Sequence, residues 1–278
     1  MKKIFFVAAL AMAFAVTSCS EDDQQIIDET KDLKLVQTLS NDTHTIELFT
    51  TDGALEQGHN QIWLRFKNKT TQFVESPETV TWKPIMHMTS MNHSCPYTGI
   101  EKSQGKETLM DGSIVFQMPD NETEYWELTI DYSIDGNTFT AVDRVDVPAS
   151  EHQRVTSFMG SDNKRYIMAL IDPAEPQVAA NDLVIGVYQM QNMMNFPQVN
   201  GYSIVHDPRM PSMGNHSSPR NVNCVQGLKG LYYGTVSLTM TGYWKFNLML
   251  YNDQGTLIKG EEVTEQNESS SLYFEVEF

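Results

Sequence analysis

The sequence predicts an all-β protein built from two tandem antiparallel β-sandwiches. Short segments alternate apolar and polar side chains, as in Trp126–Tyr132, and Gly, Asn or Asp residues separate them. No long helical periodicity interrupts this pattern. Landmark residues also recur at one interval of 122 residues, which indicates a duplicated unit. The recurring pairs are Met88 and Met210, Met91 and Met213, Gly112 and Gly234, and Met118 and Met240.

The first residues predict export. Lys2 and Lys3 precede an apolar run, Ile4–Val16, whose 13 residues are fewer than the roughly 20 of a membrane-spanning helix. Residues 1–18 are therefore interpreted as a signal peptide. The run ends at Cys19 in a sequence that resembles the lipobox of bacterial lipoproteins, so Cys19 is predicted to carry the lipid.

An acidic, polar stretch follows, and residues 19–33 are interpreted as a flexible tether. Ser20 after the cysteine favours the outer membrane, with the protein facing the periplasm or the cell surface. The lipid anchor would be the sole membrane contact.

Two repeats of about 115 residues are expected, each large enough for its own core. The first repeat is assigned to residues 34–148 and the second to 164–278, with 149–163 as linker. Strands at this spacing are typical of immunoglobulin-like sandwiches. The strands expected in the first repeat lie at 45–48, 62–66, 126–132 and 142–147. Those expected in the second lie at 167–170, 183–187, 244–250 and 273–278.

Charge and motifs exclude several function classes. The chain has 36 acidic against 19 basic residues, and its net charge of -17 would repel nucleic acid and anionic lipid. Neither a Gly-x-Ser-x-Gly nor a His-Glu-x-x-His motif is present, and the glycines around Lys106 do not fit a phosphate loop. An enzyme is not expected.

Two cysteines remain besides Cys19. An exported protein meets an oxidising environment, so Cys95 and Cys224 either form one disulfide between the repeats or stay as thiols that bind no metal. Their offsets from the nearby Met-x-x-Met motifs differ, which excludes equivalent ligand roles.

The methionines predict a metal site in each repeat. Thioethers carry no proton and remain neutral, and soft uncharged sulfur together with an imidazole selects copper(I) over zinc, calcium or magnesium. Met86 and His87 are further donors beside the first set. The candidate ligands are Met88, Met91, His93 and Met118 in the first repeat and Met210, Met213, His216 and Met240 in the second.

These residues also carry a family resemblance. The segment 207–216, with Met210, Met213 and His216, followed by 230–244, with Gly-Leu-Tyr-Tyr-Gly, Met240 and Trp244, resembles YtkA-like domains, which are related to the FixH family. The resemblance covers about half the chain and implies exported β-sandwich modules associated with copper handling. The first repeat departs from the pattern at Pro119–Tyr125, where the family has a short link. The second repeat is therefore expected to bind copper(I) more securely.

Three functions are consistent with these features. The leading hypothesis is a copper(I)-binding lipoprotein that acts as chaperone, scavenger or sensor, with a metal-efflux or surface protein as its partner. A second is a surface module that binds glycan or protein while the methionines only pack. A third is a structural spacer. The second hypothesis relies on exposed aromatic residues, for which the candidates are Trp82, Tyr97, Tyr232 and Tyr233.

Overall fold

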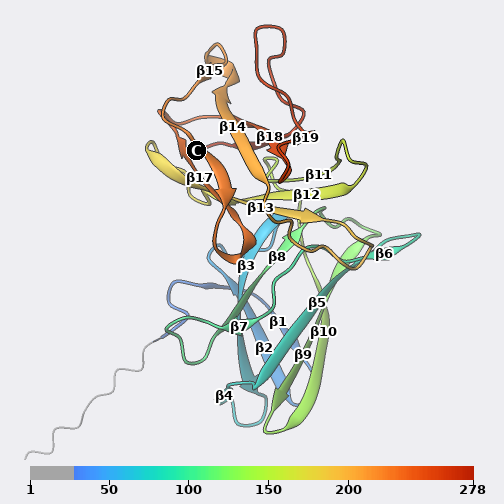
Figure 1. Cartoon of the computed structure of the whole chain (residues 1–278). Helices are drawn as coiled ribbons and strands as arrows, with labels where there is room; N and C mark the ends of the chain where they lie inside the picture. Colours follow the sequence, from blue (N-terminus) through green and yellow to red (C-terminus); the bar gives the residue numbers. More distant parts are fainter. Residues whose placement is uncertain (1–27) are drawn as a thin grey trace, which may run out of the picture.

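The structure is a computed structural model that describes residues 28–278 as two β-sandwiches (Figure 1). β1 to β10 form the first sandwich and β11 to β20 the second, and every strand pair is antiparallel. The predicted all-β class and tandem sandwiches are confirmed. The helical elements of this part of the chain are two 3-10 turns, η1 (Pro211–Met213) and η2 (Leu228–Gly230). Within residues 28–278, no helix has the length and apolarity needed to cross a bilayer.

The first sandwich packs two separate sheets against each other. One has the order β1-β2-β3-β8-β7 with β4 beside β3, and the other has the order β10-β9-β5-β6. The first sheet contains β1 (Lys34–Ser40), β2 (His44–Thr50), β3 (Gly58–Asn68), β4 (Val74–Glu75), β7 (Glu101–Lys102) and β8 (Met110–Phe116). The second contains β5 (Thr79–His87), β6 (Asn92–His93), β9 (Tyr125–Ile134) and β10 (Asn137–Val145).

The second sandwich repeats this arrangement with one difference. β16 pairs with both β17 and β14, so the two layers are joined along one edge in the order β11-β12-β13-β17-β16-β14-β18-β19. β15 pairs with β14, and β20 with β18. The strands are β11 (Val155–Met159), β12 (Arg165–Asp172), β13 (Ala180–Gln189), β14 (Ser203–Met210), β15 (His216–Ser217), β16 (Val222–Gln226), β17 (Tyr232–Ser237), β18 (Trp244–Tyr251), β19 (Leu257–Lys259) and β20 (Tyr273–Val276).

The strand order is that of an immunoglobulin-like sandwich, in which strands A, B, E and D face C, F and G. In the first unit A, B, E and D are β2, β3, β8 and β7, while C, F and G are β5, β9 and β10. In the second they are β12, β13, β17 and β16 against β14, β18 and β20. β1 and β11 add a strand beside A, and β6 and β15 fold back on C.

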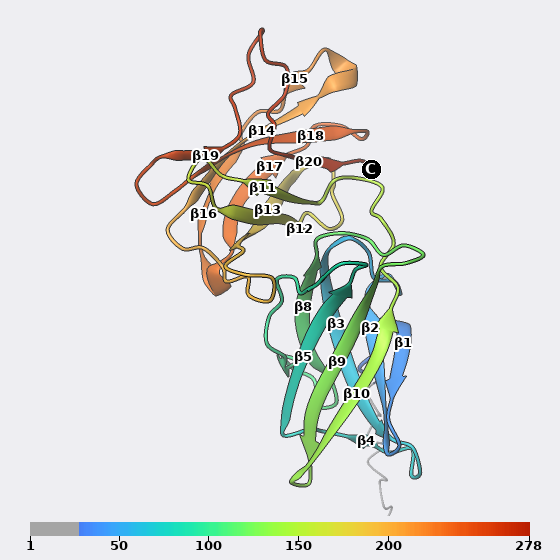
Figure 2. The same ribbon diagram turned by 90° about the vertical axis from the view of Figure 1, so that its right-hand side faces the viewer.

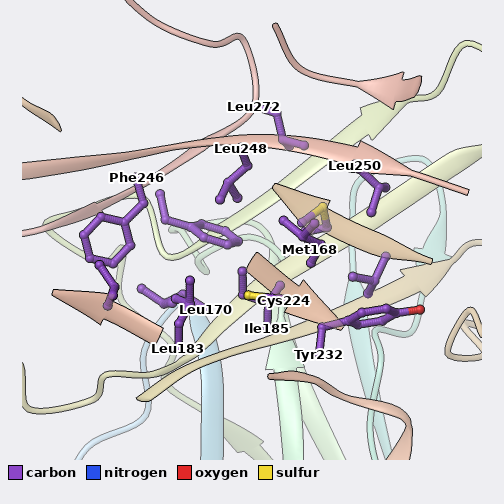
Figure 3. Packing of buried hydrophobic residues seen from close by; sticks show 14 of the residues in the cluster. Met168, Leu170, Leu183, Ile185, Cys224, Tyr232, Phe246, Leu248, Leu250 and Leu272 are labelled. Atoms are coloured by element: carbon purple, nitrogen blue, oxygen red, sulfur yellow. The ribbon is translucent and has the colours of Figure 1, made fainter. Parts of the chain in front are cut away.

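Alternation along the strands fills each core. In β9, Trp126, Leu128 and Ile130 are buried while the residues between them are more exposed, because successive side chains point to opposite faces of a sheet. In the second core, Leu183 and Ile185 of one layer face Phe246 of the other (Figure 3). Burial of these large apolar side chains is the main force holding each sandwich together.

A pair of asparagines shows that the two units are related residue by residue. Asn60 donates to the carbonyls of Glu56 and Gly58 and accepts from the Glu56 amide, all within 3.0 Å. Asn181 makes the same three bonds with Gln177 and Ala179, each at 2.9 Å. Asn60 pairs with Ile114 of β8 and Asn181 with Val236 of β17, so both hold the loop before strand B.

The two sandwiches contact each other through an apolar interface (Figure 2). Val115 points outward from β8, since its neighbours Ile114 and Phe116 point into the first core. It packs with side chains of the second unit, and the loop after β13 adds a hydrogen bond from the Ser94 amide to the Met193 carbonyl, 2.8 Å long. The second unit's side chains in this cluster are Val155, Ile167, Ala169, Tyr188 and Phe196.

Two expected boundaries need correction. Residues 149–163 are not all linker, because β11 lies inside this range and pairs with β12 as part of the second sandwich. Residues 28–33 of the expected tether make turns against the first sandwich, where the Glu29 carboxylate accepts hydrogen bonds from the Glu107 and Thr108 amides. The polar segment 28–33 is thus held in place by hydrogen bonds to backbone amides of the first sandwich.

Candidate functional site

The site in each unit begins with a histidine beside a buried tryptophan. His93, on β6, meets the edge of the Trp126 ring at a centroid distance of 5.7 Å and an interplanar angle of 88°. His216, on β15, meets Trp244 at 6.0 Å and 75°. Both tryptophans begin strand F, and both histidines lie on the short strand that folds back from strand C. Because C and F are adjacent antiparallel strands, the end of C lies beside the start of F in both units.

Each histidine is held by its Nδ1 atom. His93 Nδ1 lies 2.7 Å from its neighbour's carbonyl, Ser94 O, and His216 Nδ1 lies 3.0 Å from Met213 O. The Gln117 amide is 3.1 Å from His93 Nδ1 and also reaches Ser94 O. A carbonyl can only accept, so the contact with Met213 O requires His216 Nδ1 to carry the proton and leaves the lone pair on Nε2. At His93 the shorter contact, with Ser94 O, favours the same tautomer, whereas the Gln117 amide nitrogen can only donate and favours the other. Among residues 28–278, neither Nε2 has a hydrogen-bond partner. The tautomer with its proton on Nδ1 leaves Nε2 available to a metal.

The tryptophans bring a methionine segment to the same end. The Trp126 indole donates to Met118 O, and the Trp244 indole to Met240 O, both at 3.0 Å. These bonds confirm that Met118 and Met240 are equivalent. Neither methionine lies within a strand. β8 ends at Phe116 and β17 at Ser237, so both methionines follow the strand, in the E–F link.

The predicted equivalence of Met88 with Met210 is wrong. Met86 pairs with His93 across the β5–β6 hairpin, and Met210 pairs with His216 across the β14–β15 hairpin. Met86 and Met210 are also both buried, and each packs in the core of its own sandwich. The first hairpin is one residue longer than the second between the paired residues, so the interval between the units changes across it. It is 124 residues from Met86 to Met210 and 123 from His93 to His216, and neither equals the interval of 122.

The remaining methionines surround the histidines at different depths. In the first unit Met88 and Met118 are partly buried against the core, and Met91 is 47% exposed. In the second unit Met213 and Met240 are 54% and 37% exposed. Each unit therefore places thioethers and one imidazole at the same end of its sandwich.

The second hairpin is shaped by Pro211 and Gly214. Pro211 is the first residue of η1, and Gly214 ends this turn with φ of 71°, a conformation that favours glycine. Arg209 bonds the Asp207 carboxylate and Asn215 O, which fixes the base of the hairpin. Met213 is therefore displayed on a short, restrained turn.

The described residues at these sites include no cluster of the carboxylate, thiolate and imidazole ligands that bind harder metal ions. In the described part of the chain, no group of three or more His, Cys, Asp or Glu side chains could hold a metal ion. A carboxylate does approach the first site, where His87 lies 3.3 Å from Glu127. The donors present fit a soft, weakly charged ion such as copper(I), since neutral thioethers and one imidazole prevail.

The cysteines take no part in either site. Cys95 and Cys224 are both buried and unpaired, so the structure has no disulfide between the repeats. Burial raises the pKa of Cys95 well above its usual value and that of Cys224 to about 12. Figure 3 shows Cys224 within the second core, where it packs as a small apolar side chain.

The aromatic residues named for a surface module are only partly exposed. Trp82 and Tyr232 are buried, and Tyr232 donates to Val199 O inside the second sandwich, so these two cannot form a binding platform. Tyr97 and Tyr233 remain exposed.

Sequence reasoning named Met86 only as a further donor beside the first set, and it missed the contacts that Trp126 and Trp244 make with the sites. The sequence Met86-His87-Met88 pointed to Met86 as a possible ligand. Which of its two methionines corresponds to Met210 depends on the strand register. Trp126 was visible only as part of a strand, and Trp244 as part of a strand and of the motif that resembles YtkA-like domains. Cys19 and the signal peptide, residues 1–18, lie outside the described residues.

Comparison with known proteins adds little. No family model matches the chain, and no curated protein matches it. Among solved structures it resembles FdeC, an Escherichia coli adhesin, at 11% identity and a TM-score of 0.25, over 80% of this chain and 62% of the adhesin chain. The chain thus spans less than two thirds of that protein's length, and so weak a likeness has no bearing on function. The resemblance to YtkA-like domains remains a hypothesis based on the Met/His motifs.

Proposed function

We propose that the protein is an exported lipoprotein whose two sandwiches each bind copper(I). In the first unit the ligands are drawn from Met86, Met88, Met91, His93 and Met118. In the second they are drawn from Met210, Met213, His216 and Met240. The protein would serve as a copper chaperone, scavenger or sensor at the cell envelope, anchored through Cys19, with a metal-efflux or surface protein as its partner.

One observation carries this proposal. In both units a histidine uses Nδ1 to bond a backbone carbonyl, leaves Nε2 without a partner among the described residues, and lies among methionines beside a buried tryptophan. The contact between Nδ1 and a carbonyl thus recurs in both units, and it leaves Nε2 of each ring as the nitrogen that could bind a metal. The exposure of Met91 and Met213 supports ligation as well, because a thioether in solvent contributes little to a core.

The test is a copper(I) titration against a competing chelator under reducing conditions. We expect Met88→Leu/Met91→Leu and Met210→Leu/Met213→Leu each to lose about one equivalent of tightly bound copper(I). Leucine has nearly the volume of methionine, so folding should be preserved. The second double variant should lose the tighter site, because Pro211 restrains its turn.

A matched control keeps the result specific. Met159→Leu/Met249→Leu changes two methionines in strands β11 and β18, away from both hairpins, and should retain wild-type copper. A second variant, Met86→Leu, tests whether Met86, which strand pairing matches with Met210, is a ligand in the place of Met88, which the interval of 122 residues matches with Met210. If all variants retain copper equally, the methionines only pack, and the surface-binding or spacer hypothesis is favoured.

A further inference from the structure

A cavity of about 520 Å³ lies between the two sandwiches, at the opposite side of β3 from the first core. His59 and Trp63 of β3 line one wall, and the turn after β12 with Asp172 lines the other. Arg154, in the connection between the units, completes it. The volume falls within the roughly 300–1,000 Å³ of small-molecule pockets, which often lie between domains.

Arg154 supplies an unpaired positive charge. Among residues 28–278, Arg65, Arg144 and Arg209 have a carboxylate within 4.0 Å, whereas Arg154, like Arg165 and Arg220, has none. Arg154 is the arginine among these that lines the cavity. Its one hydrogen bond in that range runs from Nη2 to Pro173 O, 2.8 Å long. Burial lowers the pKa of Arg154, which Glu56 and Asp172 partly offset, yet a guanidinium stays charged in proteins. Its remaining N–H groups are suited to a planar carboxylate.

Neutral donors and an aromatic face lie beside this charge. Neither His59 nor the Trp63 indole has a hydrogen-bond partner in the described chain, and burial followed by the charge of Arg154 lowers the pKa of His59 to about 4. The imidazole is therefore uncharged at neutral pH and can donate or accept. The Trp63 ring offers an apolar surface with one polar edge.

Three carboxylates limit the kind of anion that fits. Asp52, Glu56 and Asp172 line the same cavity without pairing with Arg154. They repel anions, so the one negative charge of a ligand has to lie at Arg154, and further negative charges are excluded. The same carboxylates would accept hydrogen bonds from hydroxyl groups.

We propose that this cavity binds a sugar acid, a monosaccharide unit with one carboxylate and several hydroxyls. The carboxylate would pair with Arg154, the hydroxyls would donate to the acidic side chains, and the ring would lie against Trp63. This site is separate from the methionine hairpins and does not depend on copper binding.

The experiment uses the full mature chain and D-glucuronate as the probe, with D-glucose as the matched probe without a carboxylate. Binding is followed by ligand-observed NMR and by tryptophan fluorescence, since Trp82, Trp126 and Trp244 are buried and Trp63 is only partly so. We expect glucuronate to bind at least ten-fold more tightly than glucose. Arg154→Gln, which keeps an amide for Pro173 O, should abolish this preference.

Controls make the outcome decisive. Arg144→Gln removes an arginine that faces Asp120 outside the cavity and should bind like wild type. Trp63→Phe should remove the fluorescence response and weaken glucuronate binding several-fold. If Arg154→Gln does not fold, Arg154→Lys keeps the charge but loses the planar fork, and it should bind at least three-fold more weakly. Absence of glucuronate binding to the wild type, equal binding of glucose, or unchanged binding by the Arg154 variant would overturn the proposal.

Discussion

Burial changes the acid–base behaviour of single side chains at the junction of the two units. His59 faces the inter-domain cavity, where desolvation and then the positive charge of Arg154 lower its pKa to about 4 from about 6.5. Desolvation also lowers the pKa of His206, which lies under β16 in the second sandwich. Both groups are therefore more easily protonated in the unfolded chain.

This shift predicts that stability falls with acidification. Between pH 6.5 and pH 4 the unfolded state binds more protons at His59 than the folded state, so the free energy of unfolding decreases as pH falls through this window. We expect a loss of about 1–2 kcal/mol at pH 5 relative to pH 7, and His59→Gln should remove most of it. Urea denaturation at the two pH values measures the difference. An equal loss in His59→Gln would show that other groups are responsible.

At the scale of elements, the loop before strand B is held in both units by one asparagine. Asn60 is buried, whereas Asn181 makes the same three hydrogen bonds at a more exposed position. A buried amide carbonyl that loses its donor cannot be satisfied by water, but an exposed one can.

The two positions therefore form a matched pair. Asn60→Ala should lower the free energy of unfolding by about 2 kcal/mol, because Glu56 and Gly58 lose their partner in a buried setting. Asn181→Ala should cost less than about 1 kcal/mol. Chemical denaturation of both variants tests the ranking. A reversed order would mean that solvent reaches the first loop more freely than the second.

At the scale of the whole molecule, Val115 connects the sandwiches. It belongs to the first unit but packs among Tyr188 and Phe196 of the second. The same cluster explains the raised pKa of Tyr188, about 12, since burial disfavours the phenolate.

Val115→Asp should separate the units without unfolding either. The carboxylate would face an apolar interface with no cation to pair with in that cluster, so the contact should open. We expect a larger radius of gyration by small-angle X-ray scattering and unchanged β-type circular dichroism. Val142→Asp is the control, because Val142 is 47% exposed on β10. Unchanged scattering from Val115→Asp would show that other contacts hold the interface.

The local sequence was sufficient to predict the strands and the duplication. Alternation in 126–132 and 244–250 reflects a sheet with one buried face, and this requirement is visible in any single strand. The clustering of Met91 with His93 and of Met213 with His216 was also local, because each pair lies in one hairpin.

Features that depend on contacts between distant segments were not predictable. Strand pairing across the two hairpins decides that Met86, and not Met88, corresponds to Met210. Cys95 and Cys224 cannot pair because they are buried in the cores of different sandwiches. The pocket formed by Trp63, Arg154 and Asp172 exists only once the two units pack together.

By itself, the sequence determined the all-β class, the tandem repeat and the two Met/His hairpins. Tertiary structure decided the strand register, the carbonyl that each histidine Nδ1 contacts, the burial of Trp82 and Tyr232, and the cavity between the units. The physical reason is the distance along the chain over which each interaction acts. Side-chain alternation and turn residues act over a few neighbours, whereas burial, desolvation and hydrogen-bond pairing depend on groups far apart in the chain that only packing brings together.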